Sequence, residues 1–318
     1  MRSSNFSSRR GQEHFFAELD STELDEIDTL DAEAPATSLW ADAWRNLRRR
    51  PLFWISSALI LLVLSVAAFP GLFTSADPGF CELKNSLADR GPGHIFGFDR
   101  QGCDIYARVI YGARTSVLVG VLTTLFVVII GSILGAIAGY LGGWIDALLS
   151  RITDVFFAIP LVLAAIVIMQ VFQKNRGVMT VVAVLAIFGW PQIARITRGS
   201  VMSVKNSDFV TAAEALGVSR MRTLIRHIMP NSAAPIIVTA TVSLGVFIVA
   251  EATLSFLGIG LPPSVISWGG DISQAQTSLR SQPSVLFYPA GGLALTVLSF
   301  IVMGDVVRDA LDPKARTR

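Results

Sequence analysis

The residue types that usually carry out catalysis are sparse in this sequence and form no recognisable set. The three histidines, His14, His94 and His227, are far apart and lack the spacing of metal ligands. No Ser, His and Asp combination stands out as a nucleophilic site. No GxxxxGK[ST] segment is present, so the chain has no phosphate-binding loop of the P-loop type. The sequence therefore predicts a chain that is not an enzyme and holds no metal or cofactor of its own.

One stretch does combine residue types with a mechanical use: DFVTAAEALGVSRMRTLIRHIMPN, which runs from Asp208 to Asn231. Asp208 can cap a short helix over about Phe209–Leu216, whose alanines leave a slim surface. Gly217 ends that helix, where a glycine can adopt a positive φ. A second helix, rich in Arg and apolar residues, follows until Pro230. We expect this helix–break–helix unit to sit in a groove of a soluble partner and to transmit a push.

The composition of the whole chain indicates that lipid is part of its solvent. Of its 318 residues 52% are hydrophobic and 16% are charged, and the charged residues gather between long apolar stretches. A soluble domain carries about a quarter charged residues. The net charge of +2 is too small to suggest nucleic-acid binding.

Six stretches are long and apolar enough to cross a bilayer core of about 30 Å as helices. They are Leu52–Phe73, Ser116–Leu141, Ile152–Phe172, Val178–Thr197, Ala233–Leu257 and Val285–Val307. Their apolar runs are continuous, which excludes the alternating pattern of a membrane β-barrel. The predicted class is an all-α, polytopic protein with six transmembrane helices.

Basic residues near the span ends predict the orientation. Arg and Lys gather at residues 45–50, 198–226 and 308–318, which six spans place on one side, whereas Lys174 and Arg176 fall on the other. The positive-inside rule makes the richer side cytoplasmic, with both termini on that side. Four segments follow: a cytoplasmic, acidic, disordered tail at 1–43; a basic segment and first span at 44–73; an extracytoplasmic loop at 74–114; and a five-helix core at 115–313 that contains the cytoplasmic loop 200–232.

Two features inside the spans bear on helix packing. Pro160 removes a backbone donor from the third span and can kink it. Gly131, Gly135 and Gly139 form a small-residue stripe in the second span, along which another helix can approach closely. That helix belongs either to this chain or to a partner subunit.

Acidic and aromatic residues near the membrane are candidates for a transport pathway or its gate: Asp154, Glu251, Phe256 and Trp268. A carboxylate at the centre of a membrane helix costs roughly 2.5–3.5 kcal/mol, so it usually faces a cavity or a partner. For Glu251 the alternative is a structural hydrogen bond to a neighbouring helix or to the loop at Trp268.

Cys81 and Cys103 are the only two cysteines, and the predicted topology puts both in one exported loop. That compartment tolerates disulfides, so we expect a bridge, which would be worth roughly 3 kcal/mol for a loop of about 20 residues. The alternative is a pair of reduced, buried thiols.

The stretch from Thr211 to Pro230 resembles the EAA loop of ABC importer permeases, which binds the ATPase subunits. Thr211 stands where the pattern has Glu, and Glu214 lies one turn later; His227 stands where it has Ile. The ending Arg226–Asn231 is similar to that of the dipeptide/oligopeptide branch. The resemblance implies coupling roles for Thr211, Ala212, Ala213, Glu214, Gly217, Arg226, His227 and Pro230.

Further motifs in the same order extend the resemblance from about Trp44 to Pro313 and indicate the C-type subunit of that branch. They include Phe96–Asp99, Gly102–Asp104, Glu251–Gly258 and Arg308–Pro313. The family implies the type I (MetI-like) permease fold in a bacterial cell membrane. It also implies a second, homologous permease subunit, two ATPase subunits that bind ATP and Mg, and an extracytoplasmic peptide-binding protein.

The cargo implied by the resemblance is a di- or oligopeptide, but relatives also carry nickel complexes, glutathione or opines. Two other classes remain as alternatives. A secondary transporter would use ionisable residues in the membrane, such as Asp154 and Glu251, for ion coupling. A structural membrane scaffold would leave the helix–break–helix unit without a use.

Overall fold

The computed structural model describes residues 39–311. Residues 1–38 of the predicted acidic tail and residues 312–318 lie outside the described part. The chain divides into two units, Met1–Asp42 and Ala43–Arg318, and the second unit holds every span.

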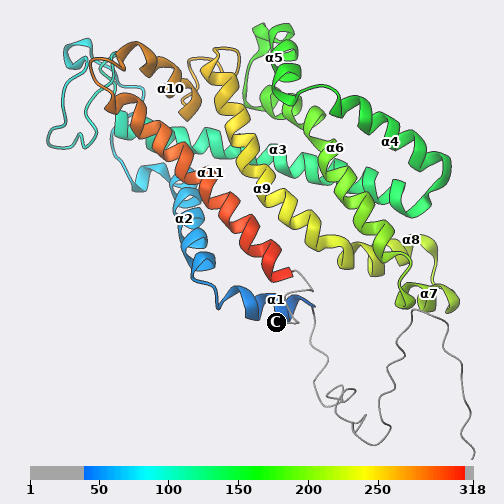
Figure 1. The fold of residues 1–318 in the computed structure, drawn as a ribbon. Helices are drawn as coiled ribbons and strands as arrows, with labels where there is room; N and C mark the ends of the chain where they lie inside the picture. The colour runs from blue at the N-terminus through cyan, green and yellow to red at the C-terminus, as the bar shows by residue number, and fades with distance from the viewer. Residues whose placement is uncertain (1–38, 312–318) are drawn as a thin grey trace, which may run out of the picture. The chain divides into compact units, whose positions relative to one another are not determined.

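The described residues form helices joined by loops and single 3₁₀ turns (Figure 1). The helices are α1 (Leu39–Leu47), α2 (Pro51–Ala68), α3 (Ile105–Leu141), α4 (Gly143–Phe157), α5 (Leu161–Val171), α6 (Val178–Val204), α7 (Asp208–Ala215), α8 (Arg220–Thr223), α9 (Met229–Phe256), α10 (Trp268–Ala275) and α11 (Ser284–Leu311). A π-helical turn, Leu224–Ile228, joins α8 to α9. Extended segments of the described chain meet only in isolated bridges, so the predicted all-α class is confirmed.

The centre of the bundle is the close contact between α3 and α6. A methyl group added to Gly135 would lie 2.3 Å from the carbonyl oxygen of Ala194 on α6. Gly131 and Gly139 approach α6 in the same way, at Ile193 and at Arg198. Of the two alternatives for the glycine stripe, the structure therefore shows packing within this chain.

Contacts between helix ends define two ends of the bundle. At the end that carries α7, the Lys205 ammonium after α6 donates to the Gly139 carbonyl of α3 at 3.0 Å. At the end that carries α10, the Arg176 guanidinium before α6 donates to the Gly258 carbonyl after α9 at 2.7 Å. We call these the α7 end and the α10 end.

The chain must return from the α7 end to the α10 end between α3 and α6, and α4 and α5 make that crossing. They meet at an angle of 80°. The third predicted span, Ile152–Phe172, is therefore a broken span, and the helix bends where a kink at Pro160 was expected. The break falls at Pro160, which lacks an N–H and has extended backbone angles, φ −58° and ψ 125°. With five unbroken spans in the described residues, this pair gives six crossings.

Two local predictions for the loop before α9 need correction. Ser207, not Asp208, occupies the N-cap position of α7, and Asp208 is its first residue. Pro230 does not end a helix, since one continuous helical span runs from Arg220 to Phe256. Pro230 is the second residue of α9 and follows the π-helical turn by two residues.

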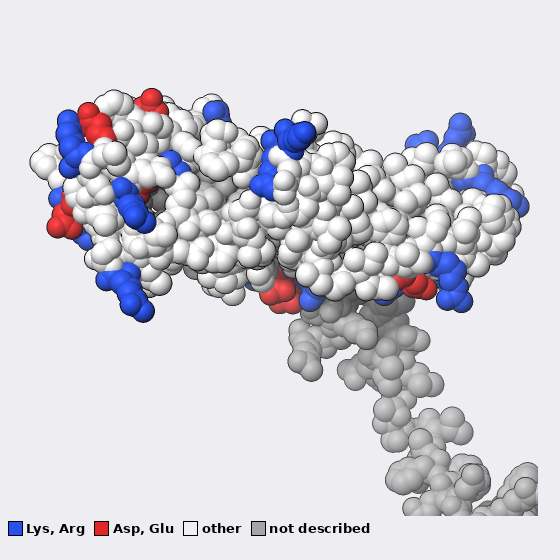
Figure 2. Space-filling model, turned by 90° about the horizontal axis from the view of Figure 1, so that it is seen from above, with Lys and Arg blue, Asp and Glu red and all other residues white. Residues whose placement is uncertain are grey.

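The surface of the bundle is suited to lipid. Figure 2 shows charged side chains in separate groups on one face, with broad uncharged surface between them. Large apolar side chains stay exposed along the spans, such as Leu61 on α2 and Ile133 on α3. This distribution fits helices that pack on one side and face hydrocarbon on the other.

The glycine stripe yields a stability prediction. Gly135→Ala should lower the free energy of unfolding by about 1–3 kcal/mol, because the added methyl group forces α3 and α6 apart. Thermal denaturation in detergent measures the change. Gly199→Ala on α6 is the matched control: nothing lies within 4 Å of its added methyl group, so it should melt at or above the wild-type temperature. Equal melting of the two variants would contradict the close contact.

Candidate functional site

The short helix α7 is anchored to the α7 end of the bundle by one face. Val210 is buried in an apolar cluster with Ala136 of α3, Val201 of α6, Leu224 and Ile228. Ala213 is buried as well. The Tyr140 hydroxyl of α3 donates to the Glu214 carboxylate at 3.2 Å. Glu214 therefore ties α7 to its own chain.

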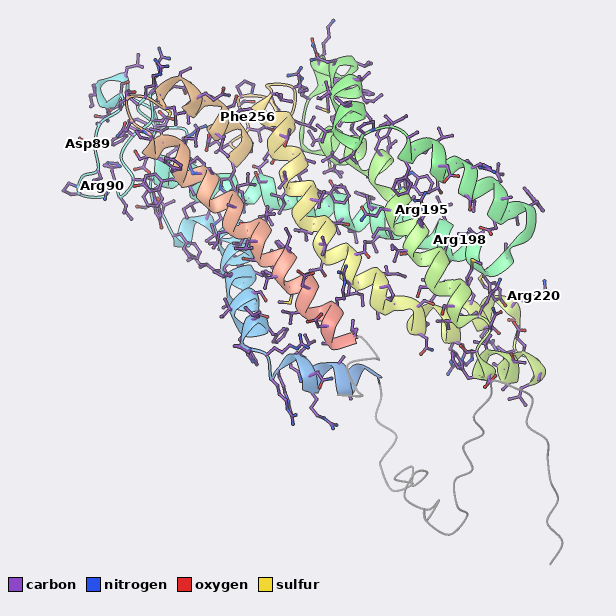
Figure 3. All side chains as sticks on the ribbon, in the orientation of Figure 1. Asp89, Arg90, Arg195, Arg198, Arg220 and Phe256 are labelled. Atoms are coloured by element: carbon purple, nitrogen blue, oxygen red, sulfur yellow. A yellow bond between two sulfur atoms is a disulfide. The ribbon has the colours of Figure 1, made fainter. Side chains whose placement is uncertain are left out.

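The opposite face of α7 is apolar and exposed. Phe209, Ala212 and Leu216 are spaced by three and four residues, so they share one face of the helix. Leu216 is 86% exposed, and Met221 at the start of α8 is 65% exposed. We call these four residues the α7 surface. An apolar patch beside exposed arginines such as Arg220 (Figure 3) is typical of a protein-docking site.

Gly217 makes the turn between α7 and α8. Its φ is +81°, so the positive φ predicted for this glycine is confirmed. The Val218 N–H donates to the Ala213 carbonyl at 3.1 Å and closes the C-terminal turn of α7. The remaining predicted coupling residues are spread over this region. Thr211 is exposed on α7, whereas Arg226, His227 and Pro230 lie at or next to the π-helical turn, on the opposite side of Gly217 in the chain.

The candidate gate residue Glu251 is fully buried. Its carboxylate accepts hydrogen bonds from the Ser116 hydroxyl of α3 at 3.0 Å and from the Ser255 hydroxyl at 2.8 Å. The Trp268 N–H of α10 donates to the same Ser116 oxygen at 3.3 Å. The hydrogen bonds expected as the alternative are present, and these residues join α3, α9 and α10.

The other two pathway candidates lie elsewhere, so the structure does not bring the four together. Asp154 pairs with Arg195 of α6 at 3.2 Å. It lines a cavity of about 260 Å³ between α3, α4 and α6. Phe256 is exposed at the end of α9, where its carbonyl accepts a hydrogen bond from Ser273 at 2.8 Å. Figure 3 shows Arg195 and Phe256 on different helices.

A disulfide joins Cys81 and Cys103 in the α2–α3 loop, residues 69–104. A backbone hydrogen bond also joins the two segments next to the disulfide, because the Glu82 N–H donates to the Gly102 carbonyl at 3.1 Å. Gly102 has a φ of +77°, and a Cβ there would lie 1.9 Å from the Glu82 oxygen. Only glycine fits this crossing. The disulfide and this contact together fix the position of Asp99, whose carboxylate accepts from the Cys103 N–H at 2.9 Å.

A buried charge cluster at the α10 end was not expected from the sequence. The Arg108 guanidinium of α3 donates two hydrogen bonds to one carboxylate oxygen of Asp271 on α10. The bond from Nε of Arg108 measures 3.0 Å, and the second comes from its Nη2. Arg108 also lies 3.8 Å from Asp99 of the α2–α3 loop. Burial raises the pKa of Asp271 from 3.8 to about 6; Arg108 opposes that rise and the Asp99 charge adds to it.

This raised pKa predicts a pH-dependent stability. Because the pKa of Asp271 is higher in the folded state than in the unfolded state, its protonation stabilises the fold. This stabilisation is fully present below pH 3.8 and is lost as pH rises through about 6. At 1.36 kcal/mol per pKa unit the loss is at most about 3 kcal/mol. We therefore expect the free energy of unfolding of the wild type, relative to Asp271→Asn, to fall between pH 4 and pH 7.5. A difference that stays constant or grows over that range would show that Asp271 is not perturbed in this way.

Comparison with known proteins identifies the family. The family described as binding-protein-dependent transport system inner membrane component matches residues 131–317, and the N-terminal TM domain of oligopeptide transport permease C matches residues 38–88. The chain is 40% identical over 279 residues to the oligopeptide transport system permease protein OppC of Bacillus subtilis (strain 168), covering 88% of this chain and 91% of that relative. It is 38% identical over 280 residues to the glutathione transport system permease protein GsiD of Escherichia coli O6:K15:H31 (strain 536 / UPEC), covering 87% and 91%.

Among solved structures, an inward-facing form of the MetNI methionine ABC transporter matches with a TM-score of 0.53 and 16% identity, over 64% of this chain and 96% of that one. At that identity the match shows the fold alone, and it confirms the MetI-like permease core. The chain therefore belongs to the binding-protein-dependent transport system inner membrane components, the multi-pass, non-catalytic permease subunits of ABC importers.

Proposed function

We propose that this chain is one of two related permease subunits of a bacterial importer of di- or oligopeptides and forms half of its translocation pathway. The observation that carries the proposal is the 40% identity to an oligopeptide permease over 88% of the chain. The second permease subunit packs beside the exposed faces of the bundle. An extracytoplasmic binding protein delivers the peptide, and the pathway opens alternately to the two sides of the cell membrane.

The α7 surface is the proposed docking site for the ATPase subunits. Its apolar and small side chains suit a groove in a soluble protein, and the anchored opposite face lets a push reach the bundle. Two such subunits bind ATP and Mg and carry out hydrolysis, while this chain holds no cofactor.

This assignment places the α7 end and both termini in the cytoplasm. The Lys and Arg residues that precede α2 and those that follow α6 and α11 support it through the positive-inside rule. The disulfide at the α10 end supports it independently, because disulfides persist outside the cytoplasm. The α2–α3 loop and residues 257–283 then form the face that receives the binding protein or plugs the outer mouth of the pathway.

The continuous helix from Arg220 to Phe256 provides the mechanical connection. Met221 of the α7 surface and buried Glu251 lie on that helix, about 45 Å apart at 1.5 Å per residue. A movement imposed on α8 is thereby carried to the hydrogen bonds that Glu251 makes with Ser116 and Ser255. In this role Glu251 holds the outer ends of α3 and α9 together and does not touch the cargo.

Glutathione is the second candidate cargo, because GsiD permeases are 38% identical over 87% of the chain. Both cargoes use the same permease machinery and the same coupling. The choice between them falls to the binding protein and to the pathway between the two permease subunits.

The docking role predicts the effect of a charge on the α7 surface. Leu216→Arg should reduce ATPase copurification about tenfold or more, since truncation or disruption of an interface anchor costs 2 kcal/mol or more. Ile95→Arg is the matched control: Ile95 is equally apolar and 58% exposed, but lies on the α2–α3 loop. Equal copurification of the two variants would remove the α7 surface from the ATPase interface.

The cargo assignment predicts the uptake phenotype. Cells that lack this chain should lose ATP-dependent uptake of labelled peptides of two to five residues, and the wild-type chain should restore it. Unlabelled peptides should compete with the labelled ones, whereas glutathione should not. Restoration of glutathione uptake alone would favour the second candidate, and accumulation that persists after ATP depletion but needs an ion gradient would favour a secondary transporter.

A further inference from the structure

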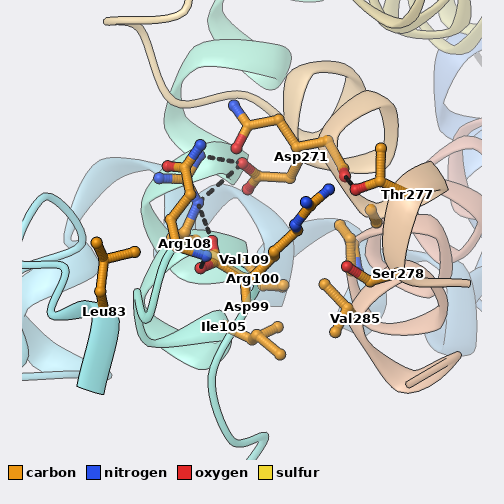
Figure 4. Close-up of a pocket in the computed structure, with 14 residues that line it drawn as sticks. Leu83, Asp99, Arg100, Ile105, Arg108, Val109, Asp271, Thr277, Ser278 and Val285 are labelled. Atoms are coloured by element: carbon orange, nitrogen blue, oxygen red, sulfur yellow. Dashed lines mark hydrogen bonds and ion pairs between the residues drawn. The ribbon is translucent and has the colours of Figure 1, made fainter. Parts of the chain in front are cut away.

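A cavity of about 420 Å³ lies at the α10 end, between the α2–α3 loop, α3, α10 and the start of α11 (Figure 4). Its walls include both signs of charge: Asp99 and Arg100 from the loop, Arg108 from α3 and Asp271 from α10. Its volume falls in the range of about 300–1,000 Å³ that is usual for small-molecule sites. The glycine stripe, the α7 surface and the Glu251 hydrogen bonds all lie outside this cavity.

The buried side of the cavity carries an acceptor without a donor. Arg108 donates both its contacts to Oδ1 of Asp271. Oδ2 of Asp271 has no hydrogen-bond partner among the described residues, although the side chain is only 8% exposed. The buried Ser278 hydroxyl, in the same lining, also lacks a partner there. Buried polar atoms are seldom left unpaired, so these two oxygens point to a donor that the chain itself does not supply.

The exposed side of the cavity carries the opposite charge. Arg100 is exposed, and within residues 39–311 no ion pair holds its guanidinium. In Figure 4 this guanidinium extends across the cavity and ends between Asp271 and Thr277. The cavity thus presents an unsatisfied carboxylate oxygen at one place and an unpaired guanidinium at another.

We propose that this cavity binds a small zwitterion, a free amino acid or a short peptide with both ends unblocked. The ligand ammonium donates to Oδ2 of Asp271 and to Ser278, and the ligand carboxylate accepts from Arg100. Leu83, Ile105 and Val285 supply an apolar wall for a side chain. The inference rests on the proposed function only in placing the cavity on the extracytoplasmic side, where such a ligand arrives before transport.

Proton binding competes with the ligand ammonium at Asp271. The carboxyl has a pKa of about 6, and a bound ammonium lowers it, so affinity should rise between pH 5 and pH 7.5. The charged groups that face Asp271 are Arg108 from α3 and Asp99 and Arg100 from the loop. From α9, the Glu251 carboxylate is already held by Ser116 and Ser255, and α11 carries no charged residue before Asp305.

Binding of radiolabelled dialanine to the full chain in lipid nanodiscs, without ATP or partner proteins, tests the proposal. We expect saturable binding that unlabelled dialanine displaces and that neither N-acetyl-dialanine nor dialanine amide displaces. Asp271→Asn and Arg100→Gln should each weaken binding about tenfold or more, the loss of one charge-assisted hydrogen bond. Arg90→Gln is the matched control, an exposed arginine on the same loop outside the cavity lining, and should bind as the wild type does (Figure 3).

Several outcomes would overturn the proposal: no saturable binding at millimolar dialanine, equal displacement by the blocked peptides, or wild-type affinity in Arg100→Gln. Arg100 is exposed and unpaired among the described residues, so its variant keeps the test valid if Asp271→Asn fails to fold. The readout is equilibrium binding without energy input. If the chain binds dialanine but fails in the ATPase copurification and uptake experiments, the result contradicts the proposed function and still supports this inference.

Discussion

The close approach of α3 and α6 is the contact on which the other parts of the bundle depend. Three glycines let the two backbones meet where any side chain would collide, and the collision at Gly135 would be with a carbonyl oxygen that has no freedom to move. Tightly packed interiors have discrete arrangements and do not deform gradually. The two helices must consequently move as one body, and whatever is fixed to their ends moves with them.

What is fixed to those ends differs in chemistry. At the α7 end, α7 itself is attached by apolar packing around Val210 and by a hydrogen bond from Tyr140 at the surface. At the α10 end they are buried polar contacts, those of Glu251 with serines and those of Arg108 with Asp271. Buried polar groups contribute little net stability but are costly to leave unpaired, so they favour one arrangement of helices over its neighbours. The α10 end is therefore held by specific partners, whereas the α7 end offers a surface to a partner from outside.

The spans and the turn at Gly217 could be predicted from the sequence because each depends on local chemistry. Whether a run of apolar residues can cross the bilayer depends only on its own length and composition. A glycine after an alanine-rich helix needs no distant partner to adopt a positive φ. The break at Pro160 was foreseen only as a kink, because the angle depends on how α5 packs. The pairing of Arg108 with Asp271, 163 residues apart, leaves no local signal at all. For Glu251 the sequence marked a costly residue correctly, but one of the two hydroxyls that satisfy it, that of Ser116, lies on α3, 135 residues away in the chain.

The neighbours of α2 have a consequence for how the protein is made. This helix packs on α3, which follows it directly, and on α11, which is synthesised last. Ser56 is almost fully buried at this contact, with its hydroxyl 4.0 Å from the Met303 sulfur, and Arg50 pairs with Asp309 at 2.6 Å. Until the ribosome has released α11, one side of α2 has only lipid or a chaperone against it. Folding in the membrane is thus completed when the last span, α11, packs against the first span, α2. A chain truncated before α11 would leave that face of α2 without its protein partner.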